Sequence, residues 1–102
     1  MTLQIVQGFQ GNKRYDLSVH DPAIDLSGSE IFFNYARRDR KTRYSIKCLN
    51  CESVHEVLIP FSIRTTSEYG KFYGEFVIRK LTGEVYIYPV LDYITLNIRR
   101  SI

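Results

Sequence analysis

The 102-residue sequence contains no tryptophan, one methionine, two cysteines and three prolines. It has no stretch of about 18 apolar residues, so the sequence predicts no membrane-spanning helix. Two cysteines are too few for a disulfide framework, and the first residues lack the basic and apolar segments of a secretory signal. We therefore expect a protein that is assembled in a reducing cytoplasm and that has neither a membrane partner nor a cofactor.

Aromatic residues are abundant instead: eight tyrosines and six phenylalanines make up 14% of the chain. Both residue types favour the pleated, half-buried surface of β-strands. The formal net charge of +3 is mild and points to solubility more than to any particular partner. The length predicts a single domain over residues 1–102, large enough to bury a core without a metal or a disulfide.

Apolar and polar residues alternate with a period of two along most of the chain, which predicts strands. A proline inside the apolar run at 57–63, Pro60, indicates an edge strand or a bulge. Thr82-Gly83 predicts a hairpin between closely spaced strands, and a further strand is expected over residues 15–20. We predict an all-β, antiparallel sandwich of seven to eight strands. Its expected core includes Phe72, Phe76, Val85, Ile87, Ile94, Leu96 and Ile98.

Four stretches carry a resemblance to a known family: Ile5-Val6-Gln7-Gly8; Tyr15-Asp16-Leu17, then Asp25-Leu26-Ser27-Gly28 and a strand from Glu30 to Tyr35; Tyr69-Gly70-Lys71-Phe72-Tyr73-Gly74-Glu75-Phe76-Val77-Ile78; and Thr82-Gly83-Glu84-Val85 to Pro89 with a terminal strand from Tyr93 to Ile98. In this order they resemble the N-terminal immunoglobulin-like domain of phage baseplate upper proteins and related virion modules. The segment 48–56 has no counterpart there. The family's domain precedes a coiled coil or further domains, whereas this chain ends at residue 102.

The resemblance implies an immunoglobulin-like sandwich with a non-enzymatic, structural role in a phage particle. It implies self-association, as a trimer before a dimer, and attachment to a larger phage capsid or tail protein. The expected location is the virion, after assembly in the host cytoplasm. A stand-alone domain of this kind is similar to a head-decoration, fibre-base or small tail-assembly protein.

Five basic residues cluster in the segment 37–43, which is predicted to be the tip of a hairpin: Arg37, Arg38, Arg40, Lys41 and Arg43. Beside Tyr35 and Tyr44, such a tip suits a phosphate backbone with stacked bases, which makes a small nucleic-acid-binding β-barrel the alternative function. The other interpretation is a solvated tip that docks on an acidic protein. Asp39 and the small net charge favour the protein partner.

Three tyrosines occupy positions on the polar side of neighbouring predicted strands: Tyr73, Tyr86 and Tyr88. Aromatic side chains gathered outside a core are typical of contact surfaces, so they are candidate residues of a subunit interface. The simpler interpretation is a sheet with a mixed outer face.

The motif Cys48-x-x-Cys51-x-x-x-His55 offers three zinc-type ligands, with His20 as the remaining histidine. A second closely spaced ligand pair is missing, so we expect no metal, and keep Cys48, Cys51 and His55 as an alternative metal site. No nucleophile elbow and no phosphate-binding glycine loop followed by a helix occurs. The sequence therefore predicts a binding protein with no catalytic residues.

Overall fold

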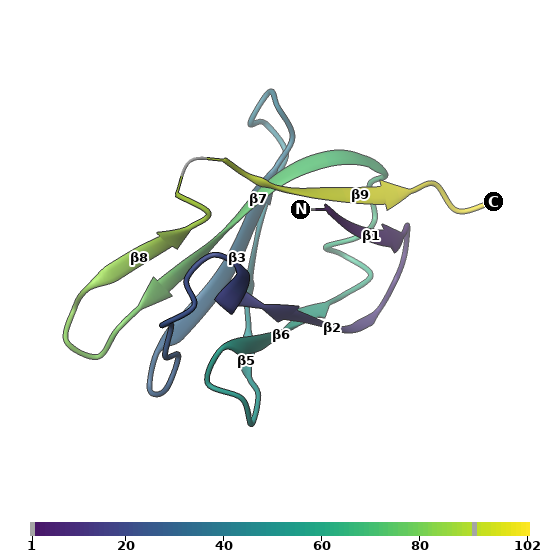
Figure 1. Ribbon diagram of the computed structural model, residues 1–102. Helices are drawn as coiled ribbons and strands as arrows, with labels where there is room; N and C mark the ends of the chain where they lie inside the picture. Colours follow the sequence, from purple (N-terminus) through teal and green to yellow (C-terminus); the bar gives the residue numbers. More distant parts are fainter. Residues whose placement is uncertain (1, 91) are drawn as a thin grey trace.

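The computed structural model describes residues 2–90 and 92–102 as two β-sheets packed face to face (Figure 1). The nine strands of this part of the chain are β1 (Thr2–Val6), β2 (Gly11–Asp16), β3 (Glu30–Ala36), β4 (Arg43–Lys47), β5 (Leu49–Asn50), β6 (Glu56–Phe61), β7 (Gly70–Arg79), β8 (Val85–Tyr88) and β9 (Ile94–Arg99). A short 3-10 helix, η1 (Leu17–Val19), follows β2. The predicted all-β sandwich is thus confirmed, with nine strands instead of seven to eight.

The first sheet has the strand order β1-β9-β7-β3-β4, and β8 pairs additionally with the end of β7. The second sheet has the order β2-β6-β5. β1 runs parallel to β9, and the other pairings described are antiparallel. Such a distribution of early and late strands over two sheets is that of an immunoglobulin-like sandwich of variable type, with β8 as an addition to the long β7.

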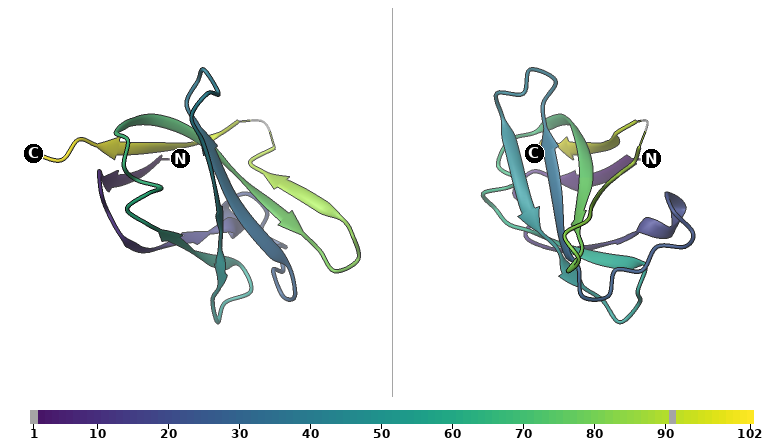
Figure 2. Two further views of the ribbon diagram at one scale, coloured as in Figure 1. Left: turned by 180° about the vertical axis from the view of Figure 1, so that it is seen from behind. Right: turned by 90° about the vertical axis from the view of Figure 1, so that its left-hand side faces the viewer.

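The core lies between the sheets and is rich in aromatic rings. Phe76 on β7 packs at 4.8 Å from Phe33 on β3 and at 4.8 Å from Tyr15 on β2, measured between ring centroids. Phe76 therefore joins the two sheets, which Figure 2 shows from two sides. The predicted inward positions Phe72, Phe76, Ile94, Leu96 and Ile98 are all buried, as the alternation indicated.

Two predicted elements differ from the structure near the chain's beginning. The strand expected over 15–20 ends at Asp16, whose carboxylate accepts a hydrogen bond from the backbone N–H of Ser18 and starts η1. Leu17 is consequently buried while Val19 is exposed, although alternation had placed both on one face. A local side-chain cap prevailed over the period-two pattern here.

The prediction that Val85 and Ile87 face the core is wrong. β8 pairs with β7 so that Tyr86 lies opposite Ile78 and Tyr88 lies opposite Phe76. Directly opposed residues point to the same face, so the tyrosines take the core side and Val85 and Ile87 point outward, 51% and 47% exposed. The β7–β8 hairpin extends beyond the second sheet at the left of Figure 1, which leaves its apolar residues uncovered.

Pro60 fits its predicted place at an edge only locally. β6 is the middle strand of its sheet, but β5 pairs only with Val57 and Leu58. On that side Pro60 has no neighbouring strand, so a residue without a backbone N–H is tolerated there.

Candidate functional site: an arginine–tyrosine groove

The basic segment forms the hairpin tip between β3 and β4, which projects at the top of Figure 1. The carboxylate of Asp39 accepts a hydrogen bond from the backbone N–H of Lys41 at 3.0 Å. The N–H of Arg40 donates to the carbonyl of Arg37 at 2.9 Å, and Arg40 adopts a left-handed conformation with φ of 60°. The tip is therefore a hydrogen-bonded turn that holds its arginines at defined positions.

Arg37 fastens this tip to the body of the domain. Its Nη2 donates to the backbone carbonyl of Tyr69 at 2.5 Å and lies 3.5 Å from a carboxylate oxygen of Glu68. Its guanidinium also lies over the ring of Phe72, at 5.0 Å from the centroid. Arg37 thus has a structural role, which separates it from the other basic residues of the segment.

Below the tip, the outer face of the six-stranded sheet is hollowed into a groove of about 770 Å³. We call it the arginine–tyrosine groove and the outer face is the one turned away from the second sheet. The side chains of Asn34, Ser45 and Glu75 come together there because Asn34 pairs with Ser45 on one side and with Glu75 on the other. Ser45 donates a hydrogen bond to the Asn34 side-chain oxygen at 2.6 Å, which fixes part of this floor.

Four arginines of the predicted basic segment line the groove, namely Arg37, Arg38, Arg40 and Arg43. Tyr73 and Tyr93 line it from β7 and from the residue before β9, with ring centroids 6.2 Å apart in an edge-to-face arrangement. The structure therefore brings together the two kinds of candidate residue that the sequence had left in separate segments. Lys41 is exposed on the tip but does not line the groove.

The charges of the groove are unbalanced. Across the described chain, the ion pairs are Arg14–Glu56, Arg37–Glu68 and His55–Asp16, so Arg38, Arg40 and Arg43 are without a carboxylate partner. Glu75 is the one acid in the lining. Three uncompensated guanidinium groups at a concave surface attract an anionic group.

The three candidate tyrosines do not form one face, so that prediction is wrong. Tyr73 alternates with buried Phe72 and Gly74 and points to the outer face, whereas Tyr86 and Tyr88 point to the inner side of β8. The error follows from the phase of β8, where we had assumed that the apolar side is the buried one. Tyr73 alone belongs to the groove.

Tyr86 and Tyr88 line a second, smaller hollow of about 200 Å³ with Asp21 and Lys80. The Tyr88 hydroxyl donates to Asp21 Oδ2 at 2.9 Å, and partial burial, with the neighbouring carboxylate, raises the pKa of Tyr88. Tyr86 stacks on Tyr88 with centroids 6.4 Å apart and donates to Glu84. These contacts tie the β7–β8 hairpin to the segment after η1.

The alternative metal site is not assembled. Cys48 is buried in the core, and burial raises the pKa of its thiol to about 12, which opposes formation of a thiolate ligand. His20 is bonded to the Tyr15 hydroxyl at 2.7 Å. Among the described residues, the group of three possible ligands that does come together contains neither cysteine.

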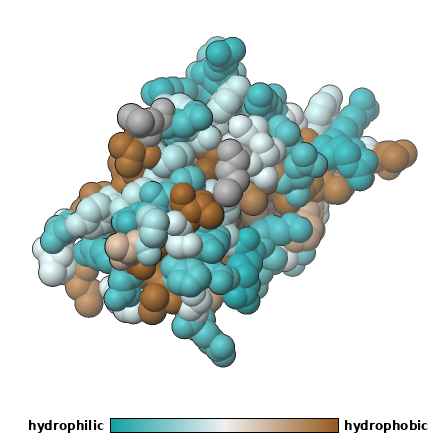
Figure 3. Space-filling view, viewed as in Figure 1, coloured by the Kyte–Doolittle hydropathy of each residue, from teal (hydrophilic) through white to brown (hydrophobic). Residues whose placement is uncertain are grey.

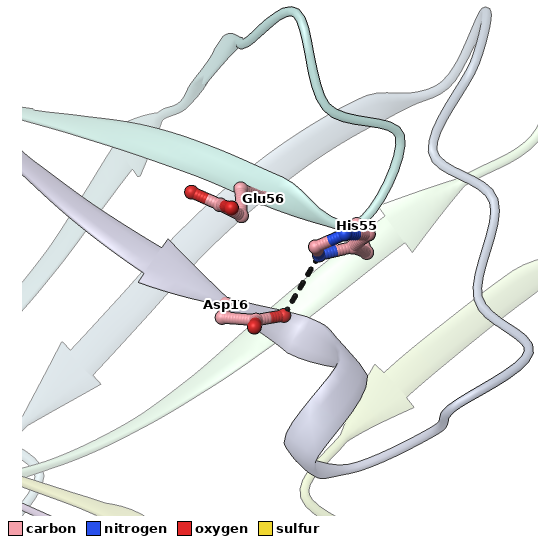
Figure 4. A group of neighbouring side chains, drawn as sticks. All are labelled: Asp16, His55 and Glu56. Atoms are coloured by element: carbon pink, nitrogen blue, oxygen red, sulfur yellow. Dashed lines mark hydrogen bonds and ion pairs between the residues drawn. The ribbon is translucent and has the colours of Figure 1, made fainter.

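That group consists of Asp16, His55 and Glu56, whose ligand atoms lie within 4.8 Å of one another (Figure 4). His55 Nδ1 lies 3.0 Å from Asp16 Oδ1, and Arg14 pairs with Glu56 at 2.9 Å. Asp16 also accepts from the Ser18 hydroxyl and backbone N–H, and these bonds, with His55, lower the pKa of Asp16. Each group already has a protein partner, so the cluster is explained as a polar link between β2 and β6.

Sequence reasoning missed Asn34, Ser45, Glu75 and Tyr93 as groove residues. Asn34, Ser45 and Glu75 do occupy outward positions in the alternation, but no local signal shows that their strands are neighbours. Pairing β3 with β4 through the basic hairpin, and then β3 with β7, supplies that information.

Comparison of the chain with protein-family models, curated proteins and solved structures finds no match. The described residues also include no helix of the length and apolar character needed to cross a membrane. Function therefore has to be argued from the surface of the molecule itself.

Proposed function

We propose that this protein is a non-enzymatic structural module of a phage virion that associates with copies of itself and attaches to a larger capsid or tail protein. The phage assignment rests on the sequence resemblance described above. The role in assembly is supported by one feature of the molecule, the exposed strand β8.

β8 is an unprotected edge. It pairs with β7 on one side, and within the described chain its other side has no strand partner. Its sequence, Val85-Tyr86-Ile87-Tyr88, carries no charge and no proline until Pro89. Monomeric sandwiches blunt such edges with charges, prolines or bulges, because unpaired backbone groups recruit another strand.

Apolar side chains surround this edge. Val85 and Ile87 point outward, and Val77 and Phe32 continue the same row across the outer face through direct pairing. Leu81 at the hairpin turn is 89% exposed. Figure 3 shows brown, hydrophobic surface among the hydrophilic surface on the side where this hairpin lies. Burying such a patch against a second copy stabilises an oligomer by the hydrophobic effect as well as by strand pairing.

The substitution Ile87→Lys tests the self-association. It places a charge on the edge and removes an exposed apolar side chain, while the inward face of β8 stays intact. We expect the unsubstituted protein to form a cyclic oligomer, a trimer before a dimer, and Ile87→Lys to be monomeric by multi-angle light scattering. Ile63→Lys, at an apolar position 60% exposed in a loop, is the matched control and should leave the oligomer unchanged. A clean monomer of the unsubstituted protein at high micromolar concentration contradicts the proposal.

The virion assignment is tested separately, by mass spectrometry of purified particles of a phage that encodes the protein. We expect the chain in stoichiometric amount with a capsid or tail protein. Its absence from particles contradicts the assignment, even if the oligomer exists.

The alternative function, nucleic-acid binding through the basic hairpin, is favoured by the three unpaired arginines beside Tyr73 and Tyr93. It predicts binding to single-stranded oligonucleotides that weakens steeply as salt is raised. Retention on such oligonucleotides at physiological salt is the measurement that checks it.

A further inference from the structure

We propose that the arginine–tyrosine groove binds an extended acidic segment of another protein, and that this segment is how the larger partner is held. The inference rests on the proposed function, because it names the chemistry of the partner to which the module attaches. It uses a surface distinct from β8, so that the two can fail separately.

Carboxylates are the chemical match for the rim of the groove. Arg38 and Arg40 come from the hairpin tip and Arg43 from the start of β4, so the cations surround one end of the hollow. Guanidinium groups bind carboxylates through two parallel hydrogen bonds, which gives geometric selectivity as well as charge attraction. Since these three arginines lack an acidic partner in the described part of the chain, a bound acid displaces no existing ion pair.

The groove is held in shape before any partner arrives. Arg37 anchors the tip through Tyr69, Glu68 and the ring of Phe72. The floor is fixed by the hydrogen bond between Ser45 and Asn34, and the wall by the contact between Tyr73 and Tyr93. A preorganised site loses less conformational entropy on binding, and tyrosine and arginine are the residues that dominate protein interfaces.

Glu75 favours a protein segment over a nucleic acid as the occupant. It lies in the lining opposite Asn34, in the middle of the sheet face. A nucleic acid carries a phosphate at every nucleotide and meets repulsion there. A peptide places acidic side chains at the arginine rim and a neutral residue or a backbone N–H donor at Glu75.

The test compares three fluorescent probes by anisotropy: a flexible glutamate-rich peptide, the same peptide with glutamine at each glutamate, and oligo-thymidylate of equal formal charge. We expect the glutamate peptide to bind most tightly and the glutamine peptide to bind at least about tenfold more weakly. Tighter binding of oligo-thymidylate than of the glutamate peptide overturns the proposal in favour of a nucleic acid, and absence of binding to the glutamate peptide overturns it outright.

A triple variant locates the binding. Arg38→Gln, Arg40→Asn and Arg43→Gln together remove the rim charges, and asparagine tolerates the left-handed conformation at position 40. The matched control is Arg64→Gln, Arg79→Gln and Arg99→Gln, which lowers the net charge equally at exposed positions outside the groove. We expect about tenfold weaker peptide binding in the first triple and less than about twofold in the second. Equal weakening in both triples means non-specific charge attraction and contradicts the site.

Two further measurements keep the result interpretable. Glu75→Gln is expected to tighten binding of the glutamate peptide severalfold, because it removes the repulsive charge from the floor. Amide shifts in the unsubstituted protein should move at Asn34, Ser45 and Tyr93 when peptide is added, and shifts confined elsewhere contradict the proposal even if a variant fails to fold. Light scattering on the same samples reports the oligomer independently, so loss of peptide binding with the oligomer intact implicates the groove and not the proposed function.

Discussion

Gly74 is the position where one missing side chain decides the packing of the core. It lies on β7 in direct register with Tyr35 of β3, beside the buried ring of Phe33. A Cβ added at Gly74 would lie 2.7 Å from two ring atoms of Phe33. That ring is held by Phe76 and Tyr35, whose centroids lie 4.8 Å and 5.4 Å away. The glycine is thus required by close approach between two strands.

The substitution Gly74→Ala is expected to lower the free energy of unfolding by about 1–3 kcal/mol, because the methyl group overpacks a ring that has no space to move into. Chemical denaturation measures the effect. Glu75→Ala on the same strand, where the side chain faces outward, is the control for strand propensity and should change stability far less. Equal stability of Gly74→Ala and the unsubstituted protein contradicts the packing described here.

At the scale of a secondary-structure element, η1 shows how capping residues end a strand. Asp16 caps its beginning through Ser18, and His20 follows its end with a backbone N–H that donates to the Leu17 carbonyl. His20 Nε2 lies 2.7 Å from the Tyr15 hydroxyl, and its ring stacks on Tyr15 at 5.8 Å. Partial burial lowers the pKa of His20 below its ordinary value. The neutral imidazole is therefore the form that fits this turn.

The resulting pH dependence has a definite sign. A folded-state pKa below the unfolded value means that the unfolded chain binds more protons, so His20 makes the protein less stable as pH falls through about 6.5. We expect a decrease in unfolding free energy between about pH 7.5 and about pH 5.5, reduced in His20→Gln, whose amide oxygen can accept from Tyr15. Urea denaturation at the two pH values measures it. An unchanged slope in His20→Gln contradicts the role of His20.

At the scale of the whole molecule, the two sheets meet through Phe76, which is fully buried and contacts Tyr15 on the opposite sheet. Phe76→Ala is expected to cost about 3–5 kcal/mol, from lost transfer free energy and the cavity left behind. Val77→Ala, next to it on the outer face, is the control and should cost less. Thermal and chemical unfolding give both values, and a cost below that of the control contradicts the assigned phase of β7.

The two proposed binding surfaces occupy different parts of the six-stranded sheet. The groove lies by the β3–β4 tip, while the apolar row of Phe32, Val77 and Ile87 leads to β8. One sheet face thus offers a charged end and an apolar end. A module that binds a scaffold with one and its own copies with the other follows from this separation.

The sequence by itself determined the class of fold and the inner faces of most long strands. In β3, β7 and β9 the alternation placed Phe33, Phe76 and Leu96 inward, and all three are fully buried. Alternation is a local property of an extended chain, so it can be read without knowing which strands are neighbours. The basic tip was found for the same reason, since its five cations are close in sequence.

Only the tertiary structure decided which apolar residues are covered and which polar residues meet. Val85 and Ile87 have the composition of an inward face, yet the second sheet does not extend under β8, so the hairpin register turns them outward. Likewise, Glu75 and Tyr93 join the basic tip only because β7 and β9 lie beside β3 in the sheet. Burial and the composition of a groove depend on contacts between distant segments, and a local pattern of residues does not encode these contacts.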